Sequence, residues 1–214
     1  MTEKLKHLRQ ITKDFEEVQT LTAEHRILKK QIRTVDRKLK TIETKYGFLS
    51  DIVSIGGHNT IIEVAAKKLF KNAGFTDVRH FVNARPKRED LQIWCEDCII
   101  IVECKGTKSQ HPPNDEIGAV KKYVDFRKSK LQSQLPIFGL TIINHDNARH
   151  FQKRITNPID TYKIEYVIAQ QFAVILTTEL VNGFLLLKNN NITFEQFKNT
   201  IKQYGLIKFD VRAD

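Results

Sequence analysis

The sequence lacks several features that define secreted and membrane-spanning proteins. It contains 3 cysteines among 214 residues, which fits a reducing compartment better than a disulfide-stabilised secreted fold. No apolar run approaches the roughly 20 residues that span a bilayer. The first ten residues, MTEKLKHLRQ, do not have the form of a signal peptide. We therefore expect a cytoplasmic protein with one sizeable hydrophobic core.

Basic residues are in excess. The chain has 35 lysines and arginines against 25 aspartates and glutamates, for a formal net charge of +10. Such an excess favours binding to a polyanion through counterion release and electrostatic steering, without specifying a nucleotide sequence. Many soluble proteins are basic, so the charge supports a nucleic-acid partner but does not establish one.

Glycine and proline are absent from the first 46 residues, and a heptad seam runs through this segment. Apolar residues, with one histidine, alternate in steps of three and four at Val18, Leu21, His25, Leu28, Ile32, Val35, Leu39, Ile42, Tyr46 and Leu49. The spacing predicts a coiled-coil helix over 1–50, and a homodimer is its simplest form. A helical hairpin folded back on the rest of the chain is the alternative. Gly47 and the Gly56-Gly57 pair mark the boundary with a second domain over 51–214.

A charged cluster ends an otherwise apolar strand pair in the middle of the chain. Two strand-like runs, 90–95 and 98–105, are separated by the polar pair Glu96-Asp97. If they form a hairpin about that break, Asp90 lies opposite Glu103, and Lys105 emerges on the same face. Burial of these charges is costly unless a partner such as a divalent metal is present. The alternative is a surface hairpin with a salt bridge.

This pattern resembles the active-site core of the PD-(D/E)XK nuclease superfamily. The resemblance implies that Asp90 and Glu103 bind Mg²⁺, with Mn²⁺ as a substitute, and that the backbone carbonyl of Cys104 is a third ligand. It implies that Lys105 orients or activates the attacking water. Glu89 stands where the family usually has a proline. The implied fold is an α/β restriction-endonuclease-like mixed central sheet flanked by helices, here preceded by a long coiled-coil helix.

These residue types suit phosphodiester hydrolysis. Carboxylate oxygens are the ligands that Mg²⁺ prefers, and the ion keeps room for water and phosphate oxygens. A bound metal lowers the pKa of its water and offsets charge in the transition state. A neighbouring lysine adds a positive donor, or acts as a base if its pKa is depressed.

Glu63 has two interpretations. It lies on a helix predicted over 59–71, where an acidic residue in the resembled fold often approaches the metal. The run from Thr60 to Glu63 also fits a capping box, in which Glu63 only satisfies a backbone donor.

Basic side chains flank the predicted hairpin and are candidates for contact with phosphates. Arg85, Lys87 and Arg88 lie in the loop that precedes the hairpin strand 90–95. Lys108 lies in the loop after the strand 98–105, and Lys121 and Lys122 lie on a helix predicted over 115–130. A solvated charge run explains the first loop almost as well.

The cysteines have a simple structural interpretation. Cys95 and Cys98 form a CxxC, but no second CxxC or Cys-His pair completes the four ligands of a structural zinc site. We expect the pair to flank the hairpin turn. Cys104 points away from Glu103 and should pack as a small apolar residue.

The remaining pattern predicts α/β alternation. Strands are expected over 77–83, 136–144 and 172–177, and helices over 158–170, 179–187 and 193–204. The leading hypothesis is a Mg²⁺-dependent endonuclease that cleaves DNA as a dimer. A non-catalytic nucleic-acid-binding or assembly module, and a structure-specific nuclease of the Holliday-junction type, are the alternatives.

Overall fold

The computed structural model describes residues 29–30, 46–56, 59–81, 88–130 and 134–209. The chain divides into two units, 1–47 and 48–214. Nearly all of the predicted heptad seam lies outside the described residues, so the coiled coil stays a prediction. Within the described part of the chain, no helix combines the length and apolar character needed to cross a bilayer.

The second unit is built on a six-stranded mixed sheet whose strands follow one another in sequence order. The strands are β1 (Asp77–His80), β2 (Leu91–Trp94), β3 (Ile99–Gly106), β4 (Ile137–Asn144), β5 (Ala173–Leu176) and β6 (Gly205–Leu206). Neighbours from β1 to β3 are antiparallel, and neighbours from β3 to β6 are parallel. The direction changes at β3, because a tight turn joins β2 to β3 whereas helical crossovers join the later strands.

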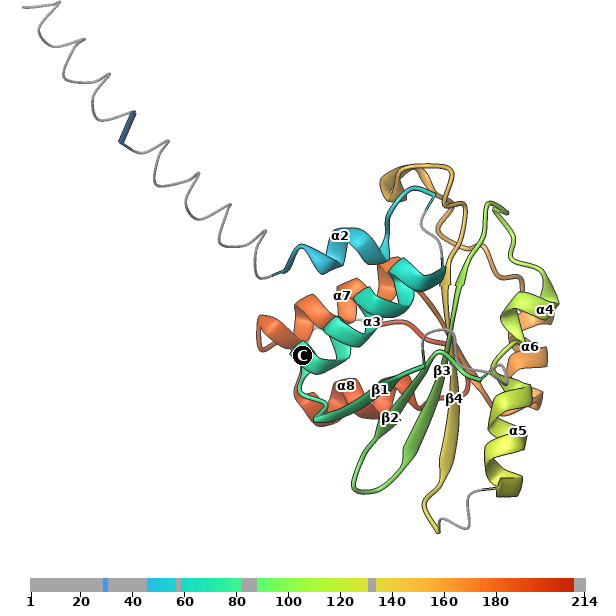
Figure 1. Ribbon diagram of the computed structural model, residues 1–214. Helices are drawn as coiled ribbons and strands as arrows, with labels where there is room; N and C mark the ends of the chain where they lie inside the picture. Colours follow the sequence, from blue (N-terminus) through green and yellow to red (C-terminus); the bar gives the residue numbers. More distant parts are fainter. Residues whose placement is uncertain (1–28, 31–45, 57–58, 82–87, 131–133, 210–214) are drawn as a thin grey trace, which may run out of the picture. The chain divides into compact units, whose positions relative to one another are not determined.

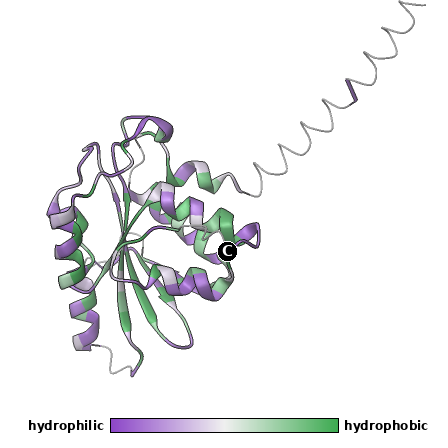
Figure 2. Cartoon of the chain, turned by 180° about the vertical axis from the view of Figure 1, so that it is seen from behind, coloured by the Kyte–Doolittle hydropathy of each residue, from purple (hydrophilic) through white to green (hydrophobic). Residues whose placement is uncertain are grey.

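Helices cover both faces of this sheet (Figure 1). One face carries α2 (Phe48–Ile52), α3 (Asn59–Ala73), α7 (Thr177–Lys188) and α8 (Phe194–Ile201). The other carries α4 (Asn114–Ile117), α5 (Lys121–Lys130) and α6 (Thr161–Ala169). The strands between them are largely hydrophobic (Figure 2). Residues 99–102 of β3 are fully buried, as expected for a strand covered on both sides.

The helix predicted over 115–130 is two helices, and this is a correction. The Gly118 N–H bonds to the Asn114 carbonyl at 2.8 Å, and α4 ends there. A Cβ on Gly118 would lie 3.2 Å from the Tyr166 hydroxyl of α6, so glycine allows the close approach. Glycine is also a poor helix former. After the break, α5 packs so tightly on β4 that a Cβ on Gly139 would lie 2.8 Å from Val124.

Other predicted elements are found with bounds that differ by a few residues, shorter for most and longer for α7. The strands predicted over 136–144 and 172–177 correspond to β4 and β5, and the helices over 158–170, 179–187 and 193–204 to α6, α7 and α8. Thr193 caps α8 in a capping box with Gln196. The two-residue strand β6, the short helix α2 and a 3-10 turn at Phe151–Lys153 were not predicted.

Candidate active site

The β2–β3 hairpin has the predicted register. Leu91 pairs with Val102, and the Asp90 N–H bonds to the Val102 carbonyl at 3.2 Å. Asp90 therefore lies just before β2, at the level of Glu103. The Cys104 N–H donates to Asp90 Oδ2 at 2.7 Å, which fixes the carboxylate against β3.

Glu103 and Lys105 form an ion pair in a protected position. Lys105 Nζ lies 2.6 Å from Glu103 Oε1, and the Glu103 side chain is 1% exposed. The alternative of a surface salt bridge is therefore wrong, although the ion pair itself exists. The second carboxylate oxygen, Oε2, is buried and has no hydrogen-bond partner among the described residues.

The pKa values of this cluster reflect crowded negative charge. Burial and then the charge of Glu103 raise the pKa of Asp90 from 3.8 to about 7, against the Cys104 hydrogen bond and Lys105. Burial lowers the pKa of Lys105, but the hydrogen bond and charge of Glu103 outweigh this effect, so the net shift is upward. The lysine thus stays protonated near neutral pH, where the raised pKa of Asp90 lies.

Glu63 joins the cluster from α3. Its Oε2 lies 2.9 Å from His80 Nε2 on β1, and both side chains are largely buried. The charge of Glu63 contributes to the raised pKa of Asp90. Because α3 begins at Asn59, Thr60 is inside the helix and cannot be its N-cap, so the capping interpretation is wrong. The metal role of Glu63 stays a proposal.

Helix α5 supplies two residues that sequence reasoning missed. Arg127 Nε donates to Glu89 Oε1 at 2.8 Å, and Glu89 is 1% exposed. Gln92 donates to the same oxygen. Glu89, which stands where the resembled superfamily usually has a proline, is therefore a buried carboxylate held by an arginine and an amide. The i, i+4 pair Tyr123 and Arg127 shares one face of α5, and that spacing was the available signal.

Tyr123 faces the same carboxylates. Burial first, and then the charges of Glu103, Asp90 and Glu89, raise the pKa of Tyr123 to about 12. Its buried hydroxyl has no hydrogen-bond partner among the described residues. The phenol is therefore a protonated hydrogen-bond donor close to the cluster, and no described residue accepts a hydrogen bond from it.

The basic residues proposed to contact nucleic acid are dispersed. Arg85 and Lys87 lie outside the described residues. Arg88 stacks on Phe81, with its guanidinium carbon 4.3 Å from the ring centre. Lys108 is exposed in the loop after β3, and Lys122 is exposed on α5. Lys121 pairs with Asp125 at 2.5 Å. On the same helix, Arg127 pairs with Glu89, and Tyr123 lies near enough to Glu103, Asp90 and Glu89 for their charges to raise its pKa.

The donor types, rather than their present spacing, suit a hard divalent cation, because among the described residues the carboxylates of the cluster do not form a group of three ligand atoms within 4.8 Å of one another. Asp90, Glu103 and Glu63 offer oxygen atoms, the ligand type that Mg²⁺ prefers, and the buried Oε2 of Glu103 has no partner among the residues that the structure describes. The net charge of these three carboxylates exceeds that of Lys105. A cation would satisfy the unpaired oxygen and reduce the repulsion. Cys104 is fully buried, so only its backbone is a candidate ligand.

Comparison with known proteins identifies the fold. No protein-family model and no curated protein sequence matches the chain. It is similar to the restriction endonuclease FokI, both in a structure of the protein and in one bound to DNA, with a TM-score of 0.55 and 16% identity in each. These similarities cover 75% of this chain and 30% of the FokI chain, so the chain spans less than a third of that protein.

A second similar structure is the small subunit of the heterodimeric restriction endonuclease R.BspD6I. There the TM-score is 0.49 at 14% identity, over 76% of this chain and 86% of that chain. The likeness to FokI and the mixed sheet flanked by helices show that the chain has a restriction-endonuclease-like fold, as the sequence predicted.

Proposed function

We propose that the protein is a Mg²⁺-dependent endonuclease that hydrolyses DNA phosphodiester bonds. The observation that carries this proposal is Oε2 of Glu103, which is buried and has no hydrogen-bond partner among the described residues. It lies beside Asp90 and Lys105 at the open end of the β2–β3 hairpin. The restriction-endonuclease-like fold supports the same reaction class. FokI has been seen bound to DNA, which supports DNA as the substrate.

Each residue of the cluster has a role in this reaction. Asp90 and Glu103 hold the cation through side-chain oxygens, the Cys104 carbonyl is a further ligand, and Glu63 adds a carboxylate from α3. The bound Mg²⁺ would supply an acidified water and offset charge on the phosphate. Mn²⁺, which also prefers oxygen ligands, should substitute for Mg²⁺.

Lys105 acts as a charged donor in this proposal. Its raised pKa keeps the ammonium protonated, so it orients the attacking water or stabilises the phosphate oxygens rather than removing a proton. Arg127 holds Glu89 and thereby fixes the chain just before Asp90. Tyr123 donates its free hydroxyl to a phosphate oxygen or to the attacking water.

The substrate contacts extend beyond the cluster. Arg85, Lys87, Arg88, Lys108, Lys121 and Lys122 are proposed to contact the backbone phosphates. The net charge of +10 predicts that affinity falls steeply with salt. A homodimer formed through residues 1–50 would bring two sites to one duplex, one for each strand.

Cleavage of supercoiled plasmid in Mg²⁺, in Mn²⁺ and in EDTA tests the proposal. Asp90→Asn, Glu103→Gln and Lys105→Met should each lower the rate at least about 100-fold, the scale expected for groups that stabilise transition-state charge. Lys68→Met, on an exposed position of α3, is the matched control and should cleave like the parent.

Cleavage that persists in EDTA and in all three site variants would refute the assignment. Tight DNA binding without cleavage across both metals would instead identify a non-catalytic binding module. Parallel assays on single-stranded DNA, RNA and a four-way junction separate general from structure-specific cleavage.

A further inference from the structure

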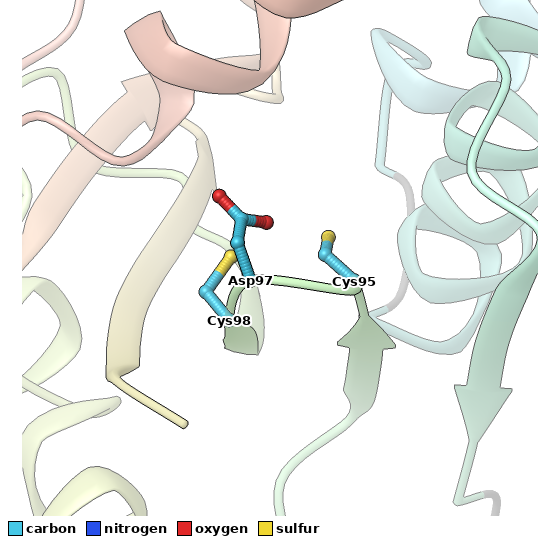
Figure 3. A group of neighbouring side chains, drawn as sticks. All are labelled: Cys95, Asp97 and Cys98. Carbon is cyan, nitrogen blue, oxygen red and sulfur yellow. The ribbon is translucent and has the colours of Figure 1, made fainter. Parts of the chain in front are cut away.

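A second group of metal-ligating side chains lies at the opposite end of the β2–β3 hairpin from Asp90 and Glu103. Cys95, Asp97 and Cys98 surround the turn that joins the two strands (Figure 3). The Cys95 N–H bonds to the Cys98 carbonyl at 2.9 Å, which closes the turn and brings both cysteines to one end of the ladder. With about 3.3 Å per strand residue, this turn is more than 10 Å from the carboxylate cluster.

The spacing of the ligand atoms is close to that of a metal site. The two sulfurs and a carboxylate oxygen of Asp97 all lie within 4.8 Å of one another. In a tetrahedral site with metal–sulfur bonds of about 2.3 Å, two sulfurs are roughly 3.8 Å apart. The three atoms are therefore within about 1 Å of the spacing that one ion requires.

The burial of the three residues leaves one side of the group open. Cys98 is 1% exposed, Cys95 is half-buried and Asp97 is exposed. The buried sulfur anchors the group to the sheet, and the exposed side leaves room for a fourth ligand from solvent. Thiolate ligands select zinc-like ions over Mg²⁺, so this group differs in kind from the carboxylate cluster.

Two lysines, Lys198 in α8 and Lys202 just after its last residue, neutralise the Asp97 carboxylate. Lys202 Nζ lies 3.1 Å from Asp97 Oδ2, and Lys198 Nζ lies 3.5 Å from Oδ1. Two thiolates and one carboxylate around a divalent ion carry a formal net charge of about −1. The empty site, with two neutral thiols and the Asp97 carboxylate, carries the same formal charge of about −1, so the two ammonium groups balance the loaded site as well as the empty one. Lys202 keeps Oδ2, while the longer contact of Lys198 leaves Oδ1 available to the ion.

We propose that this turn is a zinc-binding site with Cys95 Sγ, Cys98 Sγ and an Asp97 carboxylate oxygen as ligands and water in the fourth position. Binding forms two metal–thiolate bonds and one metal–carboxylate bond and releases two thiol protons to solvent. Through Asp97 and the two lysines, the ion ties the hairpin turn to α8. The proposal does not depend on the nuclease assignment.

Co²⁺ is the probe, because its absorption reports thiolate ligation. Titration of the reduced full chain should give thiolate charge-transfer bands that saturate at one ion per chain and that Zn²⁺ abolishes. Cys95→Ser and Cys98→Ser should remove the bands. Asp97→Asn should weaken Co²⁺ binding at least about 10-fold, because even outer-shell partners count for that much.

Two variants serve as controls, with circular dichroism to check folding. Cys104→Ala removes a thiol outside the group, and Asp90→Asn alters the other cluster; both should keep the bands. Absence of the bands in the reduced parent chain would overturn the proposal, as would bands that survive in a folded Cys95→Ser variant. One ion per two chains would contradict a site built within a single chain.

Discussion

Asp90 links the protonation of the candidate site to the stability of the protein. Its pKa is raised from 3.8 to about 7 in the folded chain, chiefly by burial and by Glu103. Folding thus favours the protonated form, so the contribution of Asp90 is fully present below about pH 4 and is lost as pH rises through 7. At about 1.4 kcal/mol per pKa unit, the loss is at most about 4 kcal/mol.

Urea denaturation in EDTA between pH 5 and 8 measures this effect. The free energy of unfolding of the parent chain should fall relative to that of Asp90→Asn as pH rises. Saturating Mg²⁺ should reverse the trend, because a cation favours the ionised carboxylate. A pH-independent difference between the two proteins would show that Asp90 does not titrate in this range.

Removal of the Tyr123 hydroxyl should affect the cleavage rate much more than the stability of the protein. The hydroxyl is buried and makes no hydrogen bond within the described part of the chain, so Tyr123→Phe should change the free energy of unfolding by no more than about 1 kcal/mol. The same substitution should lower the cleavage rate about 10- to 100-fold, if the hydroxyl donates to a charged oxygen during the reaction. Tyr162→Phe, at a position that is 72% exposed, should affect neither quantity. Unchanged cleavage by Tyr123→Phe would exclude the proposed donor role.

The predictable part of the site is the part made by local chain geometry. The relation of Asp90 to Glu103 and Lys105 follows from strand alternation about one short turn, so the sequence contained it. The contacts of Glu63 with His80 and of Glu89 with Arg127 join residues 17 and 38 positions apart. These contacts depend on how α3 and α5 pack on the sheet, and the hydrophobic periodicity of the sequence does not predict that packing.

At the scale of the element, α5 has one face that holds the site and one that faces solvent. Arg127→Met leaves the carboxylate of Glu89 buried without its ionic partner and should destabilise the protein by about 3–5 kcal/mol. Lys121→Met breaks the exposed pair with Asp125 on the same helix and should cost at most about 1 kcal/mol. Chemical denaturation of both variants makes the comparison. Equal losses would mean that the Glu89–Arg127 pair is not the element that fixes α5.

The sequence predicts the secondary-structure elements best where a strand is long and contains a run of apolar residues. Strands β3 and β4 are eight residues each and carry continuous apolar runs. The break between α4 and α5 depends on the approach of Tyr166 to Gly118, a contact made across 48 residues of sequence. Strand β6 has two residues, too few to show the alternation of apolar and polar residues that marks a strand. It is defined only by its pairing with β5.

At the scale of the whole molecule, the outstanding prediction is the dimer. It rests on heptad spacing alone, because Leu28 and Leu39 lie outside the described residues. Sedimentation equilibrium of the full chain should give a dimer, and the double variant Leu28→Asp, Leu39→Asp should give a monomer. If two sites act on one duplex, that variant should produce nicked rather than linear plasmid. A dimeric variant would place the self-association elsewhere in the chain.

The change of strand direction at β3 has a consequence for how the chain folds. The β2–β3 hairpin closes through local contacts and, like other hairpins, can form in about 1–10 μs. The β3–β4 ladder joins residues about 38 positions apart, and such non-local pairing slows folding. Asp90, Glu103 and Lys105 should therefore assemble early in water. The desolvation of their charges should then follow, as the non-local β3–β4 ladder forms and the helices pack on the sheet.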